Sequence, residues 1–252
     1  MTTATDAALC QAAGLLNRSR STVAFTGAGI SAESGIPVYR GEGGLWTKFD
    51  PYKVAHIDTF RRDPAQYWNY SLQHRRTDAA PNPAHKALVD LEARGHLQAV
   101  ITQNTDGLHQ KAGSRRVIEL HGSSHSVVCL DCERRYPRAD IDRMNREHCP
   151  PSCPECGGAY MKPTVVMFGE ALPVDALDAA QVLARAADLL LIVGSSLQVY
   201  PAAGIPRLAR DYGAQLCIIN AEPTPFDGMA AVVIHAKAGE VLPAIVQCMT
   251  TD

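Results

Sequence analysis

The sequence lacks long apolar runs, a strong net charge and a basic amino terminus. Its most apolar stretch, residues 186–193, is far shorter than the roughly 20 apolar residues that cross a bilayer. With 24 basic and 26 acidic residues, the formal net charge is −2, so no overall positive field would attract nucleic acid or an anionic membrane. Residues 1–8 contain no lysine or arginine and lead into no signal-like apolar segment. We therefore expect a cytoplasmic protein without nucleic-acid or membrane partners.

The composition that remains is typical of a folded globular chain. Its 252 residues are 46% hydrophobic and 20% charged, which suits one large domain with or without a smaller appendage. With 19 glycines and 16 prolines, the chain is neither collagen-like nor disordered.

Apolar periodicity predicts strands that alternate with helices. We expect strands at residues 21–27, 97–102, 117–121, 188–194, 215–220 and 231–235, an extended segment at 162–168, and helices at 7–16, 62–76, 85–94, 176–187, 202–212 and 240–248. Residues 124–159 interrupt this pattern because they are polar, charged and rich in cysteine. The alternation favours an α/β fold built on an open parallel sheet.

A glycine turn follows the first expected strand. Gly27 and Gly29 are suited to bring backbone N–H groups and a helix start close to a phosphate. The next glycine, Gly35, comes too late for the standard G-x-G-x-x-G spacing, so a tight turn without a ligand is the alternative explanation.

Polar side chains follow several other expected strands. Gly194, Ser195 and Ser196 follow one buried strand, and Asn220 and Glu222 follow the next. Ligands of open parallel sheets bind beyond the carboxyl ends of the strands, and Asn or Glu there can hydrogen-bond ribose hydroxyls. These ends together predict a nucleotide-sized site, although turn or helix-cap chemistry would explain each residue singly.

The same edge carries Gln103, Asn104, Asp106 and His121. A histidine beside a ribose can act as a general base near neutral pH, and Asp106 could accept hydrogen bonds from a carboxamide. The alternative to a catalytic role is that His121 is a structural or solvent-exposed histidine.

Five of the eight cysteines fall within one short segment. Two C-x-x-C pairs, Cys129 with Cys132 and Cys153 with Cys156, predict a closed tetrahedral zinc site with a structural role. Cys149 is not needed for this four-cysteine site, and the remaining three cysteines are scattered among apolar neighbours: Cys10, Cys217 and Cys248.

The ordered motifs resemble those of the sirtuin (Sir2) family over about residues 22–243. The segments that carry the resemblance are 27–31 (GAGIS), 34–37 (SGIP), 103–106 (QNTD), 119–122 (ELHG), the two C-x-x-C pairs, 168–170 (FGE) and 194–196 (GSS). The resemblance implies an NAD-dependent protein-lysine deacetylase. Such an enzyme transfers the acyl group from lysine to ADP-ribose and releases nicotinamide and O-acetyl-ADP-ribose. A mono-ADP-ribosyltransferase, or a deacylase for longer or acidic acyl groups, is the alternative.

The resemblance also implies a domain plan. A Rossmann-like large part would comprise about residues 1–38, 82–122 and 163–252, with a helical module at 39–81 and a zinc module at 123–162. NAD as co-substrate and proteins with acetylated lysine would meet between these parts, and one zinc ion would be structural.

By resemblance, His121 is the general base and Asn104 the second catalytic residue. The implied NAD-binding residues are Gly27, Ala28, Gly29, Ser31, Ala32, Tyr39, Arg40, Gln103, Asn104, Asp106, His121, Gly194, Ser195, Ser196, Asn220, Glu222 and Ala238. The implied peptide-binding residues are Val166, Phe168, Gly169, Glu170, Leu197 and Val199, which would take the substrate as an added strand.

The sequence departs from the family pattern in places. Val38-Tyr39-Arg40 stands where the family usually has Asp-Phe-Arg, and Thr105 replaces a commoner aliphatic residue, which predicts altered affinity for NAD or nicotinamide.

A further departure concerns the acyl group. Family members that prefer succinyl-lysine carry a Tyr-x-x-Arg pair, and the matching positions here are Ser71 and His74. We therefore expect acetyl to be removed faster than succinyl, unless Arg75 reaches the acyl carboxylate.

Overall fold

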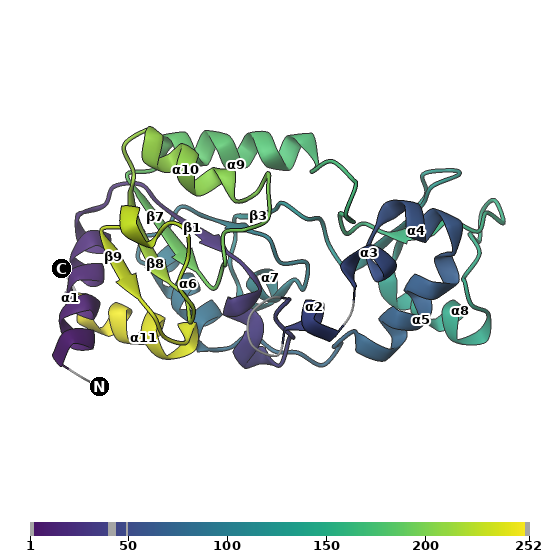
Figure 1. Ribbon diagram of the computed structural model, residues 1–252, viewed down its shortest axis with the longest axis horizontal. Helices are drawn as coiled ribbons and strands as arrows, with labels where there is room; N and C mark the ends of the chain where they lie inside the picture. The colour runs from purple at the N-terminus through teal and green to yellow at the C-terminus, as the bar shows by residue number, and fades with distance from the viewer. Residues whose placement is uncertain (1–2, 40–43, 49, 250–252) are drawn as a thin grey trace.

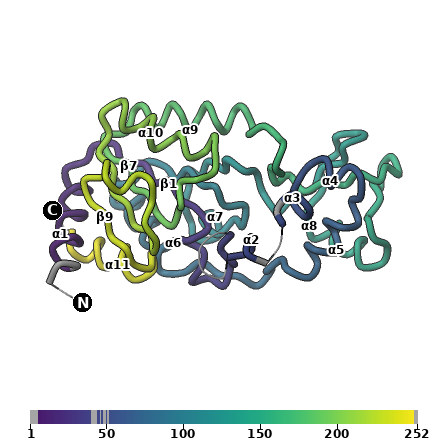
Figure 2. The backbone as a smooth tube through the Cα atoms, viewed as in Figure 1, coloured from purple at the N-terminus to yellow at the C-terminus, as the bar shows by residue number. Residues whose placement is uncertain are grey.

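The computed structural model describes residues 3–39, 44–48 and 50–249, which form an elongated molecule (Figure 1). A large body contains a parallel sheet, and a small body at the other end contains α3, α4, α5 and α8. Figure 2 follows the chain as it leaves the large body for the small one and returns, twice in succession. The small body is therefore built from two separate insertions into the large one.

Among the described residues, the large body holds a six-stranded sheet in the order β3-β2-β1-β7-β8-β9. Its strands are β1 (Thr22–Thr26), β2 (Ala99–Thr102), β3 (Val117–Glu119), β7 (Leu189–Val193), β8 (Gln215–Ile219) and β9 (Val232–Ile234). Every neighbouring pair is parallel. The chain winds outward from β1 in one direction and then from β7 in the other, so a topological switch point lies between β1 and β7.

Helices cover both faces of this sheet. On one face lie α1 (Thr3–Arg18), α6 (Pro83–Ala93) and α11 (Ala238–Cys248), and on the other α9 (Val174–Ala186) and α10 (Gly204–Asp211). β1 and β7 are buried along their whole length because both faces are covered. This sheet confirms the α/β fold class expected from the sequence.

The small body holds an antiparallel sheet in the order β5-β4-β6. Its elements are α3 (Pro51–Val54), α4 (Ile57–Arg62), α5 (Pro64–His74), β4 (Ser126–Cys129), β5 (Arg135–Pro137), α8 (Arg138–Glu147) and β6 (Met161–Pro163). The two insertions share one core: the buried Trp68 of α5 donates its indole N–H to the Met161 carbonyl at 3.0 Å. The buried guanidinium of Arg138 stacks 4.4 Å above the Trp68 ring.

Short elements complete the chain. The 3₁₀ helix η1 (Ala28–Ser34) follows β1, α2 (Leu45–Lys48) lies between the two bodies in Figure 1, α7 (Leu108–Ala112) follows β2, and η2 (Asp227–Met229) precedes β9. None of the helices in the described residues is both long and apolar enough to cross a membrane.

Three local expectations differ from the structure. The helix expected at 62–76 starts only at Pro64, because Asp63 accepts a hydrogen bond from the Gln66 N–H and caps α5, and the residues before it form a separate helix, α4, that was not expected. The extended segment at 162–168 pairs as a strand only as far as Pro163. The cysteine-rich insertion contains α8, whose surface is so charged that apolar periodicity does not reveal it.

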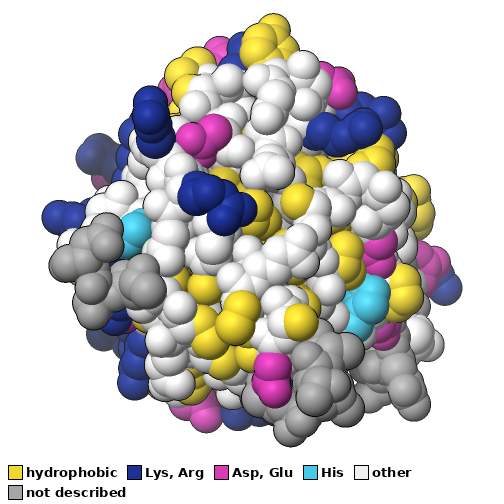
Figure 3. Space-filling view, turned by 90° about the vertical axis from the view of Figure 1, so that its left-hand side faces the viewer, with side chains coloured by type: hydrophobic (Ala, Val, Ile, Leu, Met, Phe, Trp, Pro, Cys, Tyr) yellow, Lys and Arg dark blue, Asp and Glu magenta, His cyan; other side chains and the backbone are white. Residues whose placement is uncertain are grey.

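The end of the large body that carries α1 and α11 shows lysine and arginine side chains interspersed with acidic ones (Figure 3). This mixed surface agrees with a formal net charge of only −2.

Candidate active site at the carboxyl edge of the sheet

The turn after β1 packs directly on the end of β7. The N–H of Gly27 donates to the Val193 carbonyl at 3.1 Å, and that of Gly29 donates to the Gly194 carbonyl at 2.8 Å. A Cβ atom at Gly29 would lie 2.7 Å from the Gly194 Cα, so any side chain there would push the segments apart. These glycines therefore allow the turn after β1 to pack closely on the end of β7. Their N–H groups donate to carbonyls within the protein and are not left for a phosphate.

A polar cluster lies beside this turn. The Ser31 hydroxyl donates to Asp106 Oδ2 at 2.7 Å and accepts from Asn104 Nδ2 at 3.0 Å. Asp106 Oδ1 accepts the Leu108 N–H at 2.9 Å. Ser31 and Asn104 are buried, so these hydrogen bonds hold both side chains in one orientation. The structure thus brings Ser31 together with Asn104 and Asp106, which lie more than 70 residues later in the sequence.

Two buried histidines that were not predicted as site residues, His85 and His109, lie next to this cluster. His85 Nε2 lies 3.5 Å from Ser31 Oγ, and His109 Nε2 lies 2.9 Å from Thr26 Oγ1. Their ring centroids are 4.9 Å apart. Burial lowers the pKa of His85 to about 4 and that of His109 to about 3, so both rings are neutral near pH 7.

A signal for His85 was present in the sequence. Asn82 caps α6 and Pro83 follows it, which places His85 in the first turn as part of a capping box. The Asn82 side chain also donates to the Ile30 carbonyl at 2.7 Å, which ties this cap to η1.

His121 lies just beyond β3, and its Nδ1 is 2.9 Å from the Gln103 carbonyl oxygen. Because a carbonyl can only accept, Nδ1 carries the proton, and the neutral ring keeps a lone pair on Nε2. Burial lowers the pKa of His121, and the hydrogen bond to Gln103 opposes this effect. The ring is therefore neutral at pH 7 and suited to accept a proton at Nε2.

Gln103 and Ser195 join the ends of β2 and β7, the two strands on either side of β1. Gln103 Nε2 donates to Ser195 Oγ at 2.7 Å, and Ser195 Oγ also accepts the Leu197 N–H at 3.3 Å. Ser195 is buried, so this pair serves first as a brace between β2 and β7.

The residues beyond β8 form a separate group on the other side of the switch point. Asn220 Nδ2 donates to the Glu222 carbonyl at 2.6 Å, and the Asn220 carbonyl lies 3.1 Å from His235 Nδ1. Ala238 opens α11, whose Gly239 N–H donates to Glu33 at 2.7 Å.

The other expected NAD-binding residues lie along the same edge. Ala28 and Ala32 are in η1, Tyr39 follows η1, and Ser196 follows β7. Arg40 lies outside the described residues.

The expected peptide-binding segments are hydrogen-bonded to His121 and Ser195 at this edge of the sheet and to Ala55 of the small body. The Val166 N–H donates to the His121 carbonyl at 2.8 Å, so this segment is fastened to the histidine. The Phe168 N–H donates to the Ala55 carbonyl at 2.8 Å. Leu197 is 2% exposed with a φ of 56°, so only its main chain is available to a ligand.

The four cysteines lie together in the small body. Cys129 Sγ is 3.7 Å from Cys156 Sγ, Cys132 Sγ is 3.7 Å from Cys153 Sγ, and all four lie within 4.8 Å of one another. Zinc–sulfur bonds of about 2.3 Å in a tetrahedron imply sulfur separations of about 3.8 Å. The arrangement therefore fits one zinc ion, and four protein ligands leave no position for a catalytic water.

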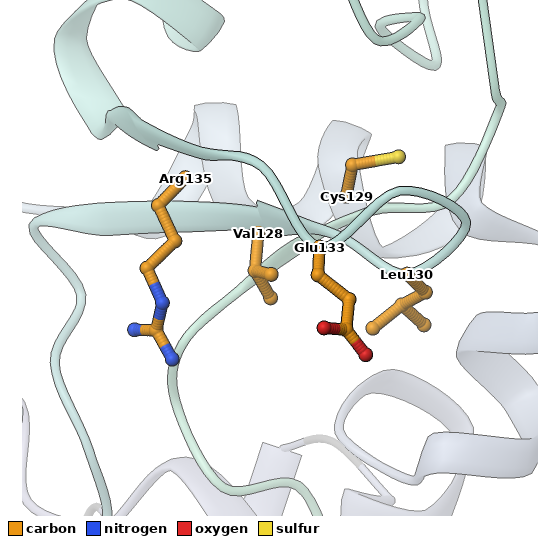
Figure 4. Close-up of a pocket in the computed structure, with 5 residues that line it drawn as sticks. All are labelled: Val128, Cys129, Leu130, Glu133 and Arg135. Atoms are coloured by element: carbon orange, nitrogen blue, oxygen red, sulfur yellow. The ribbon is translucent and has the colours of Figure 1, made fainter. Parts of the chain in front are cut away.

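A surface hollow on the small body is separate from this edge. It is lined by Val128, Cys129, Leu130, Glu133 and Arg135 (Figure 4). In Figure 4 the thiol of Cys129 points away from the Glu133 and Arg135 side chains, so the hollow does not open onto the sulfur.

Comparison with known proteins decides the family. Residues 27–201 match the profile of the Sir2 family. The chain belongs to the Sir2 family. An Archaeoglobus fulgidus protein named NAD-dependent protein deacylase 2 is 51% identical over 94% of both chains.

Solved Sir2 structures give the same result. A Sir2 variant with a deacetylated peptide and 3′-O-acetyl ADP-ribose superimposes with a TM-score of 0.90, at 39% identity over 94% of this chain and 98% of that one. A Sir2 protein bound to a myristoylated histone peptide gives 0.83, at 44% identity over 96% of each chain. The sirtuin resemblance noted in the sequence is confirmed.

Proposed function

We propose that this Sir2 protein is an NAD-dependent protein-lysine deacetylase. The observation that carries the proposal is the neutral His121, whose Nδ1–H is fixed on Gln103 and whose Nε2 is left as a base. The Ser31–Asn104–Asp106 cluster lies at the same edge of the sheet, where such sheets bind nucleotides. The similar proteins named above supply the reaction type.

The residues present suit NAD as a co-substrate. Ser31, Asn104 and Asp106 would hold the carboxamide and the nicotinamide ribose, and Asn220 and Glu222 would hold the adenosine ribose. When bound, NAD supplies an electrophilic ribose carbon and a nicotinamide leaving group. His121 Nε2 takes a proton from a ribose hydroxyl, while the Gln103 carbonyl keeps the ring oriented. The neutral His85 and His109 offer hydrogen bonds without adding positive charge behind the site.

The second substrate is a protein carrying an acylated lysine. Segments 166–170 and 197–199 flank the site, and an extended peptide between them would gain main-chain hydrogen bonds with little sequence specificity. This mode suits an enzyme that acts on many lysines.

The side chains at the end of α5, which carries Ser71 and His74, favour acetyl over succinyl as the acyl group that is removed. Ser71 is buried and accepts a hydrogen bond from Arg138 Nη2 at 2.7 Å. Arg75 Nη1 lies 2.7 Å from Asp142 Oδ2, so its guanidinium is already paired. His74 Nδ1 lies 2.9 Å from the Tyr70 carbonyl. A succinyl carboxylate would therefore be desolvated without an available arginine.

Direct ADP-ribosyl transfer to a protein side chain is the competing reaction. It requires no deprotonation of a ribose hydroxyl, so the base arrangement of His121 favours deacetylation instead. Mass spectrometry of an acetylated peptide incubated with NAD separates the two. Deacetylation lowers the peptide mass by one acetyl group, whereas a gain of one ADP-ribose would refute the proposal.

A further inference from the structure

Lys162 and Glu170 form a charged pair at the base of the segment that would bind the peptide. Lys162 is 5% exposed, and its Nζ lies 2.9 Å from Glu170 Oε2. Lysine is almost never buried without a partner, so this position is built around its charge. The Glu170 carboxylate faces inward to Lys162, although the sequence resemblance assigned Glu170 to the peptide.

The ammonium group of Lys162 is fully used. Besides Glu170, it donates to the Val165 carbonyl at 2.7 Å and to the Pro163 carbonyl at 3.1 Å. A lysine ammonium has three N–H donors, and each has a partner here. Glu170 Oε2 in turn accepts the Met167 N–H at 2.8 Å. Lys162 and Glu170 thus hold the backbone of residues 163–170 in one closed arch.

The arch is attached to both neighbouring parts of the molecule. The Val166 N–H donates to the His121 carbonyl in the large body. In the small body, the Phe168 N–H donates to the Ala55 carbonyl, and the Phe168 carbonyl accepts the N–H of Ile57, the first residue of α4. Within the described residues, the Val166 carbonyl accepts no main-chain hydrogen bond and the Gly169 N–H donates none. These groups remain for an added strand.

We propose that Lys162 is a positioning residue for substrate binding, which fixes the arch 163–170 in the shape that receives the acyl-lysine peptide. This inference rests on the proposed function. Without the ammonium group, the Val165 carbonyl loses its donor, the Glu170 carboxylate keeps only the Met167 N–H, and the arch relaxes. Peptide binding must then reorder the arch, and the cost of that ordering weakens the peptide complex. Of the described residues that would bind NAD, only His121 is hydrogen-bonded to the arch, through its main-chain carbonyl, so NAD binding should change much less than peptide binding.

The alternative is that the pair only stabilises the fold. A buried ion pair is weak evidence for stability, because desolvation offsets much of the attraction between the charges. A purely structural role lowers the amount of folded enzyme and its melting temperature. It does not change the KM for one substrate selectively.

The test uses Lys162→Met, which keeps the length of the side chain and removes the charge. We expect KM for an acetylated peptide to rise about tenfold, while KM for NAD stays within about twofold. Lys162→Arg retains charge and donors and should restore most of the peptide affinity. Lys111→Met is the matched control, because Lys111 also donates to a main-chain carbonyl, that of Ala79 at 2.8 Å, but is exposed.

Three outcomes overturn the inference. These are an unchanged peptide KM in Lys162→Met, an equal rise in both KM values, and no recovery in Lys162→Arg. If Lys162→Met does not fold, Glu170→Gln is judged by the same KM criteria. Fluorescence anisotropy of a labelled acetyl-peptide measures binding without turnover. An inactive wild-type enzyme therefore refutes the proposed function, while the binding data still decide the role of Lys162.

Discussion

The imidazole of His121 and the main-chain carbonyl of Gln103 are joined by a 2.9 Å hydrogen bond that connects the second residue after β3 to the first residue after β2. This bond selects the tautomer with the proton on Nδ1 and leaves Nε2 as the basic nitrogen. The chemistry of the site therefore depends on how β2 and β3 end side by side in the parallel sheet.

Replacing His121 with alanine should abolish most turnover and spare NAD binding. The side chain moves a proton and is not a main anchor for the cofactor, so we expect kcat to fall by about 10²–10⁴-fold. Steady-state kinetics and calorimetric titration with NAD measure the two effects. Near-normal deacetylation by His121→Ala would show that another group is the base.

The pH dependence of the reaction should follow the lowered pKa of His121. Burial shifts the pKa below the ordinary value of about 6.5, so the ring stays neutral and basic at pH 7. We expect kcat/KM to be flat near pH 7 and to fall only below about pH 6.5 as the ring is protonated. A decline centred above that pH would contradict this environment for His121.

Stability should decrease in mild acid because His85 and His109 are buried in the neutral form. Their pKa values of about 4 and 3 lie below the ordinary 6.5, so between these values the unfolded chain binds more protons. The free energy of unfolding therefore rises with pH in that range, and the protein becomes less stable as the pH falls. At pH 5, His109 alone should account for about 2 kcal/mol relative to pH 7.

His109→Gln provides the comparison, because glutamine does not titrate. Urea unfolding at pH 7 and pH 5 should show a smaller loss of stability in this variant than in the wild type. Equal losses in the two proteins would mean that His109 is not kept neutral by the fold.

Zinc should be structural and present at one ion per chain. Cys153→Ser removes one of four ligands whose sulfur atoms lie within 4.8 Å of one another, and metal binding is coupled to folding. We expect loss of zinc, poorer solubility and a melting temperature lower by at least about 5 °C. Cys10→Ser, on the exposed side of α1, is the control and should keep its zinc. A folded, soluble wild-type protein without zinc in metal analysis would refute the site.

Acetyl-lysine should be a better substrate than succinyl-lysine. Arg75, at the end of α5, is paired with Asp142 at 2.7 Å, so its guanidinium is not available to the carboxylate of a succinyl group. We expect kcat/KM to favour the acetylated version of one peptide by at least about tenfold. Equal or better succinyl turnover would mean that Arg75 leaves Asp142 and binds the substrate.

The sheet could be predicted from the sequence because its strands are buried on both faces. β7 reads as a continuous apolar run and β1 as an apolar run between two threonines, and the structure confirms both strands. The small body could not be predicted in the same way. Its α8 presents a charged surface, and its core arises only when Trp68 meets Met161 across a long sequence separation.

The candidate site was predictable in position but not in detail. Strand ends placed Asn104, Asp106 and His121 at one edge, yet no local pattern reveals that His109 lies behind Thr26. Likewise, the motif containing Glu170 suggests a peptide contact, and only the fold shows the carboxylate turned toward Lys162. Roles set by a partner distant in the sequence require the structure.

The most direct test of the account follows every product of one reaction. Wild-type protein is incubated with an acetylated peptide and NAD, and mass spectrometry measures the peptide, nicotinamide and O-acetyl-ADP-ribose together. The account predicts that each acetyl group lost from the peptide yields one nicotinamide and one O-acetyl-ADP-ribose, and that His121→Ala slows deacetylation of the peptide and formation of O-acetyl-ADP-ribose by about 10²–10⁴-fold. Release of nicotinamide with the acetyl group still on the peptide, or with ADP-ribose attached to the protein, would contradict it.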